Sequence, residues 1–354
     1  MSRLDRIRRL VAGLDADALL VTFLPDVRWA VGFTGSNGVL VVTRDAAHFV
    51  TDGRYAVQAR QEVAEAEVHV PGYRLFEHVA EEGLLGDAEA VLVQADHLTV
   101  ADLERLCLLL PDVKVQPVAD LLVEEVAAKS EPEIDAIRAA QAVTDAVFEE
   151  ILPYVQPGMS ELDLAAEIVY QHLKRGCERM AFEPIVASGA RAALPHARPT
   201  SRTIRPGELV LIDMGGVRDG YASDMTRTVA VGEPDPEART VYGVVLDAQQ
   251  AALDVLAAGK TGREIDQAAR AVIAAAGYGE AFAHSLGHGI GLQTHEWPRL
   301  SSRVEDVLPA GAAVTIEPGV YLPDRFGVRI EDLAVVREGG HENLTASPKT
   351  LLVL

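Results

Sequence analysis

The chain has 354 residues, of which 49% are hydrophobic and 24% charged, a composition typical of a water-soluble globular protein of about two or three domains. The net charge of −21 argues against a nucleic-acid-binding protein, because that class needs a basic surface. Two cysteines, Cys107 and Cys177, are too few for a disulfide framework or a cysteine zinc site. The N-terminal segment is too charged for a signal peptide and no apolar run could span a bilayer, so we expect a cytoplasmic protein.

Short runs of branched apolar residues alternate with helical patterns through residues 1–125, which predicts an α/β domain. The expected strands are residues 17–22, 38–43, 47–52, 90–94 and 113–118. The expected helices are residues 53–66 and 99–110. The sequence GSNG at 35–38 predicts a tight turn between two strands.

A domain boundary is expected near residue 126, which divides the chain into 1–126 and 127–354. Ser130 followed by Glu133 is a capping-box pattern, and Pro132 suits the first turn of a helix. A helical stripe of apolar residues follows, formed by Ile134, Ile137, Ala140, Val143, Val147 and Ile151. The second domain therefore opens with a long helix.

The second domain contains two similar halves. The sequence PGMSELDL at 157–164 matches AGKTGREI at 258–265, and RPGELVLIDMG at 205–215 matches PAGAAVTIEPG at 309–319. Each half then turns back as a hairpin that carries a second acid. The repeat predicts an α+β domain with pseudo-twofold symmetry and a site between its halves.

Four acids interrupt apolar, strand-like segments of this domain: Asp213, Asp224, Glu317 and Glu331. Any one of them could be an ordinary strand-end residue or a surface ion pair. Burying all four is costly unless positive charge meets them, and no cluster of Lys or Arg is spaced to do so. With His288 they form an oxygen-rich ligand set that suits two divalent cations such as Mn²⁺, Co²⁺ or Zn²⁺, an arrangement used by hydrolases.

These segments carry a family resemblance over roughly residues 130–345. The sequences LIDMGG, SDMTRT, HSLGHGIGLQTHE, TIEPGVY and VRIED resemble those of the pita-bread metallopeptidases, and within them the Xaa-Pro peptidases, aminopeptidase P and prolidase. The sequences GFTGSNG and TDGRY resemble the creatinase-like N-terminal domain. The resemblance implies an α/β creatinase-like N-terminal domain followed by an α+β pita-bread catalytic domain with internal pseudo-twofold duplication.

The resemblance also implies a role for each ligand. Asp213 would hold one metal, Asp224 and Glu331 would bridge both, and His288 and Glu317 would hold the second. Mn²⁺ is the expected metal, with Co²⁺ or Zn²⁺ as alternatives. Glu317 would accept a proton from the attacking water and pass it to the leaving nitrogen.

Three further histidines resemble substrate or catalytic histidines of the family. His196 and His295 are expected to hydrogen-bond the developing oxyanion or the prolyl carbonyl, and His284 is expected to contact substrate. A structural role is the alternative for each of them.

Of three other residues considered, Arg329 and Trp29 have two interpretations each. Arg329 lies two residues from Glu331, so it would either pair with a ligand carboxylate, which we favour, or bind substrate. Thr226 is expected to hydrogen-bond Asp224. Trp29 would lie in the core or contribute to substrate binding in a neighbouring subunit.

The sequence therefore predicts a dinuclear-metal hydrolase for peptides with proline second, acting as a homodimer or larger homo-oligomer. The N-terminal motifs favour an Xaa-Pro aminopeptidase over a prolidase. A prolidase would bind the prolyl carboxylate with an arginine, for which Arg28, Arg191, Arg198 and Arg325 are candidates. A non-catalytic module that binds peptides or proteins is a remote alternative, against which the complete ligand set argues.

Overall fold

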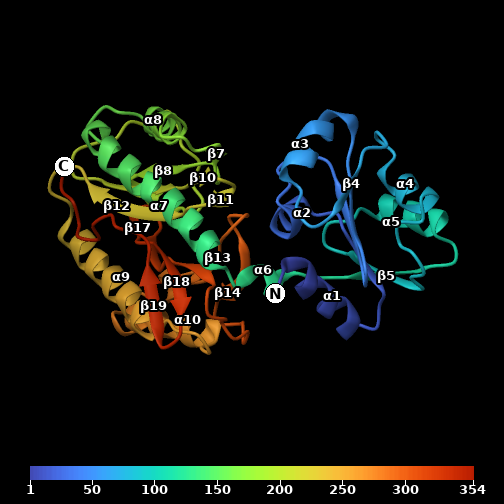
Figure 1. Cartoon of the computed structure of the whole chain (residues 1–354). Helices are drawn as coiled ribbons and strands as arrows, with labels where there is room; N and C mark the ends of the chain where they lie inside the picture. The colour runs from blue at the N-terminus through green and yellow to red at the C-terminus, as the bar shows by residue number, and fades with distance from the viewer. The chain divides into compact units, whose positions relative to one another are not determined.

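The computed structural model describes all 354 residues, and the chain divides into two compact units, Met1–Val126 and Ala127–Leu354 (Figure 1). No helix combines the length and the apolar character that a membrane crossing requires.

The first unit contains a six-stranded mixed sheet in the order β4-β3-β2-β1-β5-β6. Its strands are β1 Ala18–Val21, β2 Val39–Thr43, β3 Ala47–Val50, β4 Glu67–His69, β5 Ala90–Gln94 and β6 Lys114–Val118. All five strands expected from the sequence are present. The edge strand β4 was not predicted, because three residues are too short for an alternating pattern to be recognised.

Helices cover both faces of this sheet (Figure 1). They are α1 Arg3–Gly13, α2 Leu24–Val31, α3 Ala56–Glu62, α4 Leu75–Glu81 and α5 Val100–Leu109; a short helix, α6 Val123–Ala127, follows the last strand and ends at the first residue of the second unit. Leu20, Val41 and Val93 of the sheet form one core with Val79 of α4 and Leu106 of α5. The α/β character expected for this half follows from that packing.

The turn predicted at residues 35–38 does not join the two elements that the sequence suggested. This segment joins helix α2 to strand β2, not two strands. Helix α2 begins after Phe23 with a proline in its first turn and ends at Gly32, whose φ of 86° permits the left-handed cap. A helix of eight residues gives a weak periodic signal, so the sequence did not reveal it.

The two N-terminal motifs hold each other in place. Asn37 donates a hydrogen bond to Asp52 (2.6 Å), and Thr51 donates one to the carbonyl of Asn37 (2.6 Å). Arg54 makes two bonds of 2.9 Å to the carboxylate of Asp52, which is fully buried. This charge-assisted network lowers the pKa of Asp52, with the Arg54 bonds as the largest cause. The motifs therefore stabilise the connection between β3 and α3.

The second unit has four long helices, α7 Glu131–Ile151, α8 Glu161–Lys174, α9 Pro236–Val255 and α10 Gly262–Ala275. Helix α7 begins as predicted, because the Glu133 carboxylate accepts a bond from the N–H of Ser130 (2.8 Å). All six residues of the predicted stripe are buried.

The strands of this unit form four small sheets, β12-β9-β8, β11-β10-β7, β14-β13-β15-β18-β19 and β16-β17. The strands are β7 Arg179–Met180, β8 Ile185–Ser188, β9 Leu209–Met214, β10 Gly216–Arg218, β11 Tyr221–Ala222, β12 Met225–Ala230, β13 Gly287–Gly289, β14 Glu296–Leu300, β15 Ala313–Ile316, β16 Gly319–Leu322, β17 Phe326–Arg329, β18 Asp332–Arg337 and β19 Gly340–Asn343. Helices α7 and α8 pack on β8, β9 and β12, whereas α9 and α10 pack on β15, β17 and β18.

The two halves repeat the same local devices. Ser160 caps α8 and Thr261 caps α10, each accepting a bond from a backbone N–H three residues later. Gly207 (φ 81°) and Gly311 (φ 87°) make equivalent left-handed turns before β9 and β15. The pseudo-twofold duplication predicted from the sequence is present in the fold.

Each hairpin is broken near the acid that it carries. The first runs from β9 through β10 and β11 to β12, with its turn at Asp219 (φ 50°) and Gly220 (φ 81°). A Cβ on Gly215 would lie 1.9 Å from the carbonyl oxygen of Ser223, so only glycine allows this approach. The second hairpin is interrupted in the same way between β15 and β16 and between β17 and β18. Breaking the ladder frees side chains at the strand ends to point into a shared cavity.

Candidate metal centre

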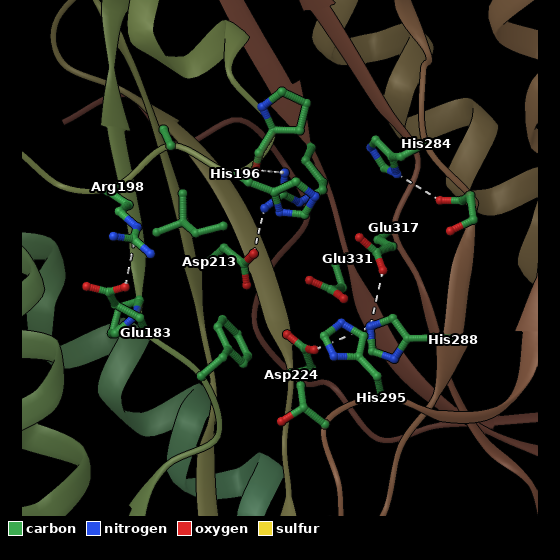
Figure 2. A pocket seen from close by; sticks show the side chains of 18 of the residues that line it. Glu183, His196, Arg198, Asp213, Asp224, His284, His288, His295, Glu317 and Glu331 are labelled. Atoms are coloured by element: carbon green, nitrogen blue, oxygen red, sulfur yellow. Dashed lines mark hydrogen bonds and ion pairs between the residues drawn. The ribbon is translucent and has the colours of Figure 1, made fainter. Parts of the chain in front are cut away.

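A cavity of about 410 Å³ lies among the strand ends of the second unit (Figure 2). Its floor contains all five residues predicted as metal ligands. The remaining lining includes Phe182, Glu183, Pro184, Ile185, Pro195, His196, Arg198, Pro199, His284, Thr294, His295, Arg299 and Arg329.

Five different segments supply the ligands. Asp213 is in β9, His288 is in β13, Asp224 and Glu331 immediately precede β12 and β18, and Glu317 immediately follows β15. Figure 2 shows their side chains pointing toward one another. Ligand atoms of Asp224, His288 and Glu331 lie within 4.8 Å of one another.

The strand registers explain this convergence. Thr226 pairs with Asp213, so Asp224 lies diagonally across from Asp213 on the same face, not directly opposite it. The register that pairs Ile316 with Asp332 brings Glu317 and Glu331 opposite each other just beyond the strand ends.

The predicted bond between Thr226 and Asp224 is wrong. The Thr226 hydroxyl donates instead to Glu331 (2.7 Å), 105 residues away, and the N–H of Glu331 donates to the carbonyl of Thr226 (3.1 Å). Thr226 and Asp224 are two residues apart, so their side chains share a face of the sheet. The carboxylate of Glu331 on the adjoining segment nevertheless accepts the hydrogen bond from Thr226. Thr226 therefore joins the two halves at the metal centre.

His288 presents an unprotonated ring nitrogen to the carboxylates. Its Nδ1 lies 3.0 Å from the carbonyl of Gly289, which can only accept, so Nδ1 carries the proton. Nε2 then faces Glu317 (3.4 Å) and Asp224 (3.7 Å) with its lone pair. Burial lowers the pKa of His288 to about 3, so the ring is neutral. A lone pair among carboxylate oxygens is the arrangement that a cation stabilises.

The carboxylates carry more negative charge than the protein alone neutralises. Burial is the largest cause that raises the pKa of each one, well above the usual range for Asp224 and Glu331 and to about 7 for Glu317. The neighbouring acids raise these pKa values further. In addition, Asp213 Oδ1 is buried without a hydrogen-bond partner. The donor set and its charge fit two divalent cations.

Arg329 is buried beside the ligands and forms an ion pair with one of them. Its Nη2 lies 2.6 Å from Asp213 Oδ2, and its side chain is only 3% exposed. Its other nitrogens donate to Thr226 (3.0 Å), Tyr321 (2.9 Å) and the carbonyl of Pro195 (3.2 Å). All of these contacts are with protein atoms, which agrees with the ion-pair interpretation of Arg329.

The three additional histidines line the same cavity but differ in hydrogen bonding and solvent exposure. His284 donates from Nδ1 to the carbonyl of Ser285 (2.7 Å) and accepts at Nε2 from Tyr321 (2.9 Å), so both of its ring nitrogens are already hydrogen-bonded within the protein. Burial lowers the pKa of His284 to about 4. His196 and His295 are solvent-exposed, and the ring of His295 lies 4.3 Å from that of His288.

Trp29 does not lie at this centre. Its side chain is 1% exposed in the core of the N-terminal unit, and the guanidinium groups of Arg3 (5.7 Å) and Arg6 (5.3 Å) lie over its ring. A side chain so fully enclosed cannot contact substrate, so its proposed binding role is corrected to a core role. Tyr321 and Arg299 were not singled out by the sequence, because no local motif distinguishes a tyrosine or arginine that a distant strand brings to a cavity.

A buried set of four carboxylates and a neutral imidazole, on strands contributed by two similar halves, defines a metal-dependent hydrolase. The chain belongs to metallopeptidase family M24, whose model matches residues 135–338, and residues 3–126 match the creatinase/prolidase N-terminal domain. The fold is thus a creatinase-type α/β domain followed by a pita-bread catalytic domain, as the sequence predicted.

Several proteins of known name are similar to this chain over nearly its whole length. An Xaa-Pro dipeptidase structure from Bacillus anthracis has a TM-score of 0.97 and 38% identity over 99% of both chains. An X-Pro aminopeptidase structure from Thermotoga maritima has a TM-score of 0.91 and 34% identity over 100% of both chains. The Xaa-Pro dipeptidase of Pyrococcus furiosus is 33% identical over 98% of this chain and 99% of its own.

Proposed function

We propose that this chain is an Xaa-Pro dipeptidase, which hydrolyses dipeptides whose second residue is proline. The observation that carries the proposal is one cavity that combines the five-residue metal centre with the exposed guanidinium of Arg198. The names of similar proteins, in which dipeptidases outnumber aminopeptidases, support the same substrate class.

Asp213, Asp224, His288, Glu317 and Glu331 would hold two divalent ions, for which Mn²⁺ is our proposal because oxygen ligands predominate. Bound metal supplies Lewis acidity and lowers the pKa of water from about 15.7 toward 7. The chain's own contribution is to fix the ligand atoms on strand ends and to keep Nε2 of His288 unprotonated.

Proton transfer is assigned to Glu317. Its side chain is 18% exposed, so water can reach it, and Thr315 holds Oε1 through a bond of 3.1 Å. The carboxylate would take a proton from the attacking water and deliver it to the prolyl nitrogen, which has no hydrogen of its own. His196 and His295, exposed in the same cavity, would donate hydrogen bonds to the carbonyl oxygen as negative charge develops on it.

Arg198 would bind the carboxylate of a dipeptide. Its only ion-pair partner is Glu183 at 3.8 Å, and the two side chains are 85% and 71% exposed. So loose a contact is easily exchanged for a bidentate bond with a substrate carboxylate. The other candidates are less suitable: Arg191 pairs with Glu161, and Arg325 pairs with Glu237.

An Xaa-Pro aminopeptidase is the second candidate. The exposure of Arg198 and Glu183 leaves room for a longer chain to pass, which favours it. The N-terminal motifs that favoured an aminopeptidase bond to each other inside the first unit, so they bear on the folding of that unit and not on substrate length.

Three substrates separate the candidates in Mn²⁺-loaded protein: Ala-Pro, Ala-Pro-amide and Ala-Pro-Ala. We expect the dipeptide to be cleaved fastest. Arg198→Gln should lower kcat/KM for Ala-Pro by roughly 10–100-fold, the worth of a charge-assisted bond, and leave the amide unaffected. Arg325→Gln is the matched control, because this exposed arginine pairs with Glu237 outside the cavity, and it should leave kcat/KM for both substrates unchanged.

Equal or faster cleavage of Ala-Pro-Ala would instead establish the aminopeptidase. Absence of cleavage of all three by metal-loaded protein would reject both candidates. The expected homodimer is a separate proposal, measured by sedimentation equilibrium.

A further inference from the structure

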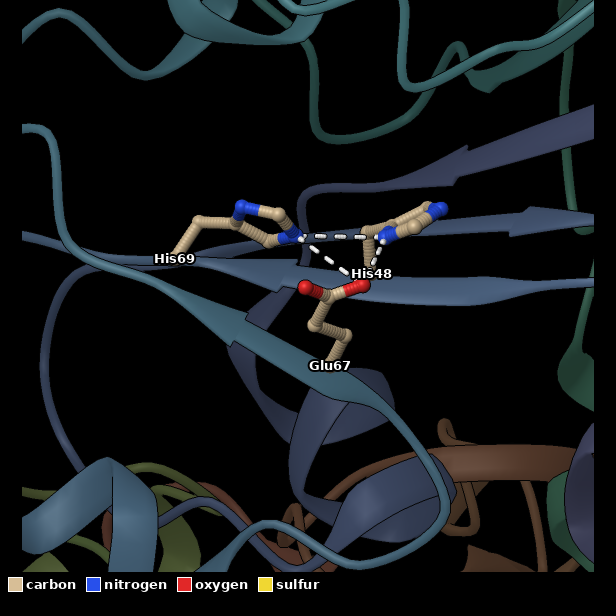
Figure 3. Close-up of side chains that lie close together, drawn as sticks. All are labelled: His48, Glu67 and His69. Atoms are coloured by element: carbon tan, nitrogen blue, oxygen red, sulfur yellow. Dashed lines mark hydrogen bonds and ion pairs between the residues drawn. The ribbon is translucent and has the colours of Figure 1, made fainter.

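A second group of metal-binding side chains lies in the N-terminal unit, on strands β3 and β4 (Figure 3). The parallel register pairs His48 with Glu67, and side chains alternate along a strand, so His69 points to the same face as Glu67. Ligand atoms of these three residues lie within 4.8 Å of one another. All three belong to residues 1–126, whereas every ligand of the catalytic centre belongs to residues 127–354.

The distances match those of a bound transition metal. His48 Nδ1 and His69 Nε2 are 3.2 Å apart, and Glu67 Oε2 lies 3.6 Å from the first nitrogen and 3.9 Å from the second. Zinc bonds of about 2.0–2.1 Å in a tetrahedral arrangement place ligand atoms about 3.3–3.4 Å apart. Small side-chain rotations would therefore bring all three atoms to bonding distance.

The solvent exposure of these three side chains suits a shared metal-binding role. The side chains of His48 and His69 are 17% and 18% exposed, so they are largely shielded from water, whereas Glu67 is 70% exposed and remains open to it.

His78 on helix α4 provides an independent observation. Its ring lies 5.3 Å from that of His69, and its Nε2 is buried without a hydrogen-bond partner. Buried nitrogens normally have a hydrogen-bond partner, so this unpartnered imidazole nitrogen close to His69 supports a ligand at the cluster.

We propose that His48, Glu67 and His69 bind one divalent transition-metal ion, with Zn²⁺ or Ni²⁺ as the fitting type, and that water completes the coordination. Two imidazoles and one carboxylate suit these ions and do not suit Mg²⁺ or Ca²⁺, which prefer oxygen ligands.

The ion would fasten strand β4 to the sheet. This strand has three residues, lies at the edge and pairs only with β3. A metal that joins the side chains of both strands adds a crosslink where the backbone ladder is shortest. The role is therefore structural and independent of peptidase activity.

The test compares Zn²⁺ binding by full-length wild-type protein and His69→Gln, measured by equilibrium dialysis and metal analysis. We expect the variant to bind one ion fewer per chain. Its loss of affinity at this site should exceed the roughly 10–100-fold cost of losing an outer-shell partner. Mn²⁺-dependent peptidase activity should be unchanged, because no catalytic ligand is altered.

His97→Gln is the matched control. His97 belongs to the same unit but stacks on Phe23 (3.6 Å), away from the cluster, so its replacement should leave Zn²⁺ stoichiometry at the wild-type value. Glu67→Gln is the second ligand variant, and its exposure makes normal folding easy to preserve. Circular dichroism of the metal-free variants checks their folding.

In crystals of the wild-type protein soaked with Zn²⁺, an anomalous peak bounded by the three side chains would support the site. Equal Zn²⁺ stoichiometry and affinity in wild type, His69→Gln and Glu67→Gln would overturn it. A failure of the peptidase proposal would leave this result untouched, because the measurement does not use substrate.

Discussion

At the residue scale, we propose two roles for Glu317, one as a metal ligand and one as the group that moves a proton. Its backbone N–H donates to the carbonyl of Leu286 (2.8 Å), and Thr315 holds its carboxylate, so the side chain has a defined position at the end of β15. The carboxyl oxygen that faces His288 at 3.4 Å is on the ligand side of the cavity. A substitution that keeps the shape but removes the titrating oxygen separates the two roles.

Glu317→Gln should lower kcat by about 10²–10⁴-fold with a small change in KM, because it removes general acid–base catalysis. The measurement is steady-state kinetics on Ala-Pro, with metal content determined on the same samples. A metal-replete variant with near-normal kcat would show that another residue moves the proton, and the exposed His196 would then be tested.

At the scale of elements, the metal centre depends on how closely β13 approaches β15. A Cβ on Gly287 would lie 2.0 Å from the carbonyl oxygen of Thr315, so any larger residue must push the strands apart. His288 follows directly and would move with β13.

Gly287→Ala should therefore destabilise the protein by about 1–3 kcal/mol and weaken Mn²⁺ binding. Gly243→Ala in helix α9 is the control, because no atom lies within 4 Å of the added methyl group and alanine favours helix by about 0.5–1 kcal/mol. Chemical denaturation and Mn²⁺ titration measure both effects. Unaltered Mn²⁺ affinity in Gly287→Ala would show that His288 is positioned by other contacts.

A buried hydrogen-bonded chain connects helices α7 and α8 to the segment before Asp224. His172 Nδ1 donates to the carbonyl of Ile168 (2.9 Å), so Nε2 must accept from the hydroxyl of Thr144 (3.1 Å). Thr144 in turn lies 2.8 Å from the hydroxyl of Ser223, which accepts from the N–H of Gly216 (3.0 Å). The chain requires neutral His172, and burial lowers the pKa of His172 below 6.5.

This arrangement predicts that acid destabilises the fold through His172. The unfolded chain takes up a proton near pH 6.5, whereas the folded chain resists it, so stability falls as the pH drops below about 6.5. The slope that one such group adds is at most about 1.4 kcal/mol per pH unit. Denaturation between pH 7 and 5 should give a shallower slope for His172→Gln than for wild type, and equal slopes would contradict the assignment.

At the scale of the whole molecule, metal binding and folding stability are linked through the four clustered acids. Without metal their mutual repulsion opposes folding, because neighbouring acids raise the pKa values of the buried Asp224 and Glu331. With metal, the same acids stabilise the native state through binding, by about 2.7 kcal/mol for each ion present at 100 times its Kd.

Asp224→Asn should consequently raise the stability of the metal-free protein and lower the stability of the metal-loaded protein. In chelator it should unfold at a higher temperature than wild type, because one buried negative charge is removed. In saturating Mn²⁺ it should unfold at a lower temperature, because a ligand is lost. Differential scanning calorimetry under both conditions measures the reversal, and an Asp224→Asn protein that is destabilised equally in both would contradict the linkage.

Much of this protein was predictable from local sequence because its strongest signals are local. Acids within apolar strands are costly, so Asp213, Asp224, Glu317 and Glu331 stand out without any tertiary information. Ser160 and Thr261 mark helix starts through their own side-chain bonds, and the repeated spacing to Gly207 and Gly311 reveals the duplication.

Only the tertiary structure decided which of these residues meet. Arg329 reaches Asp213 across 116 residues, and Thr226 reaches Glu331 across 105, since broken hairpins from two halves share one cavity. Burial of Trp29 and alignment of His48 with His69 depend likewise on how strands and helices pack in the first unit. The sequence determined the chemical groups, because residue type is local, whereas their geometry depended on strand register and packing between distant segments.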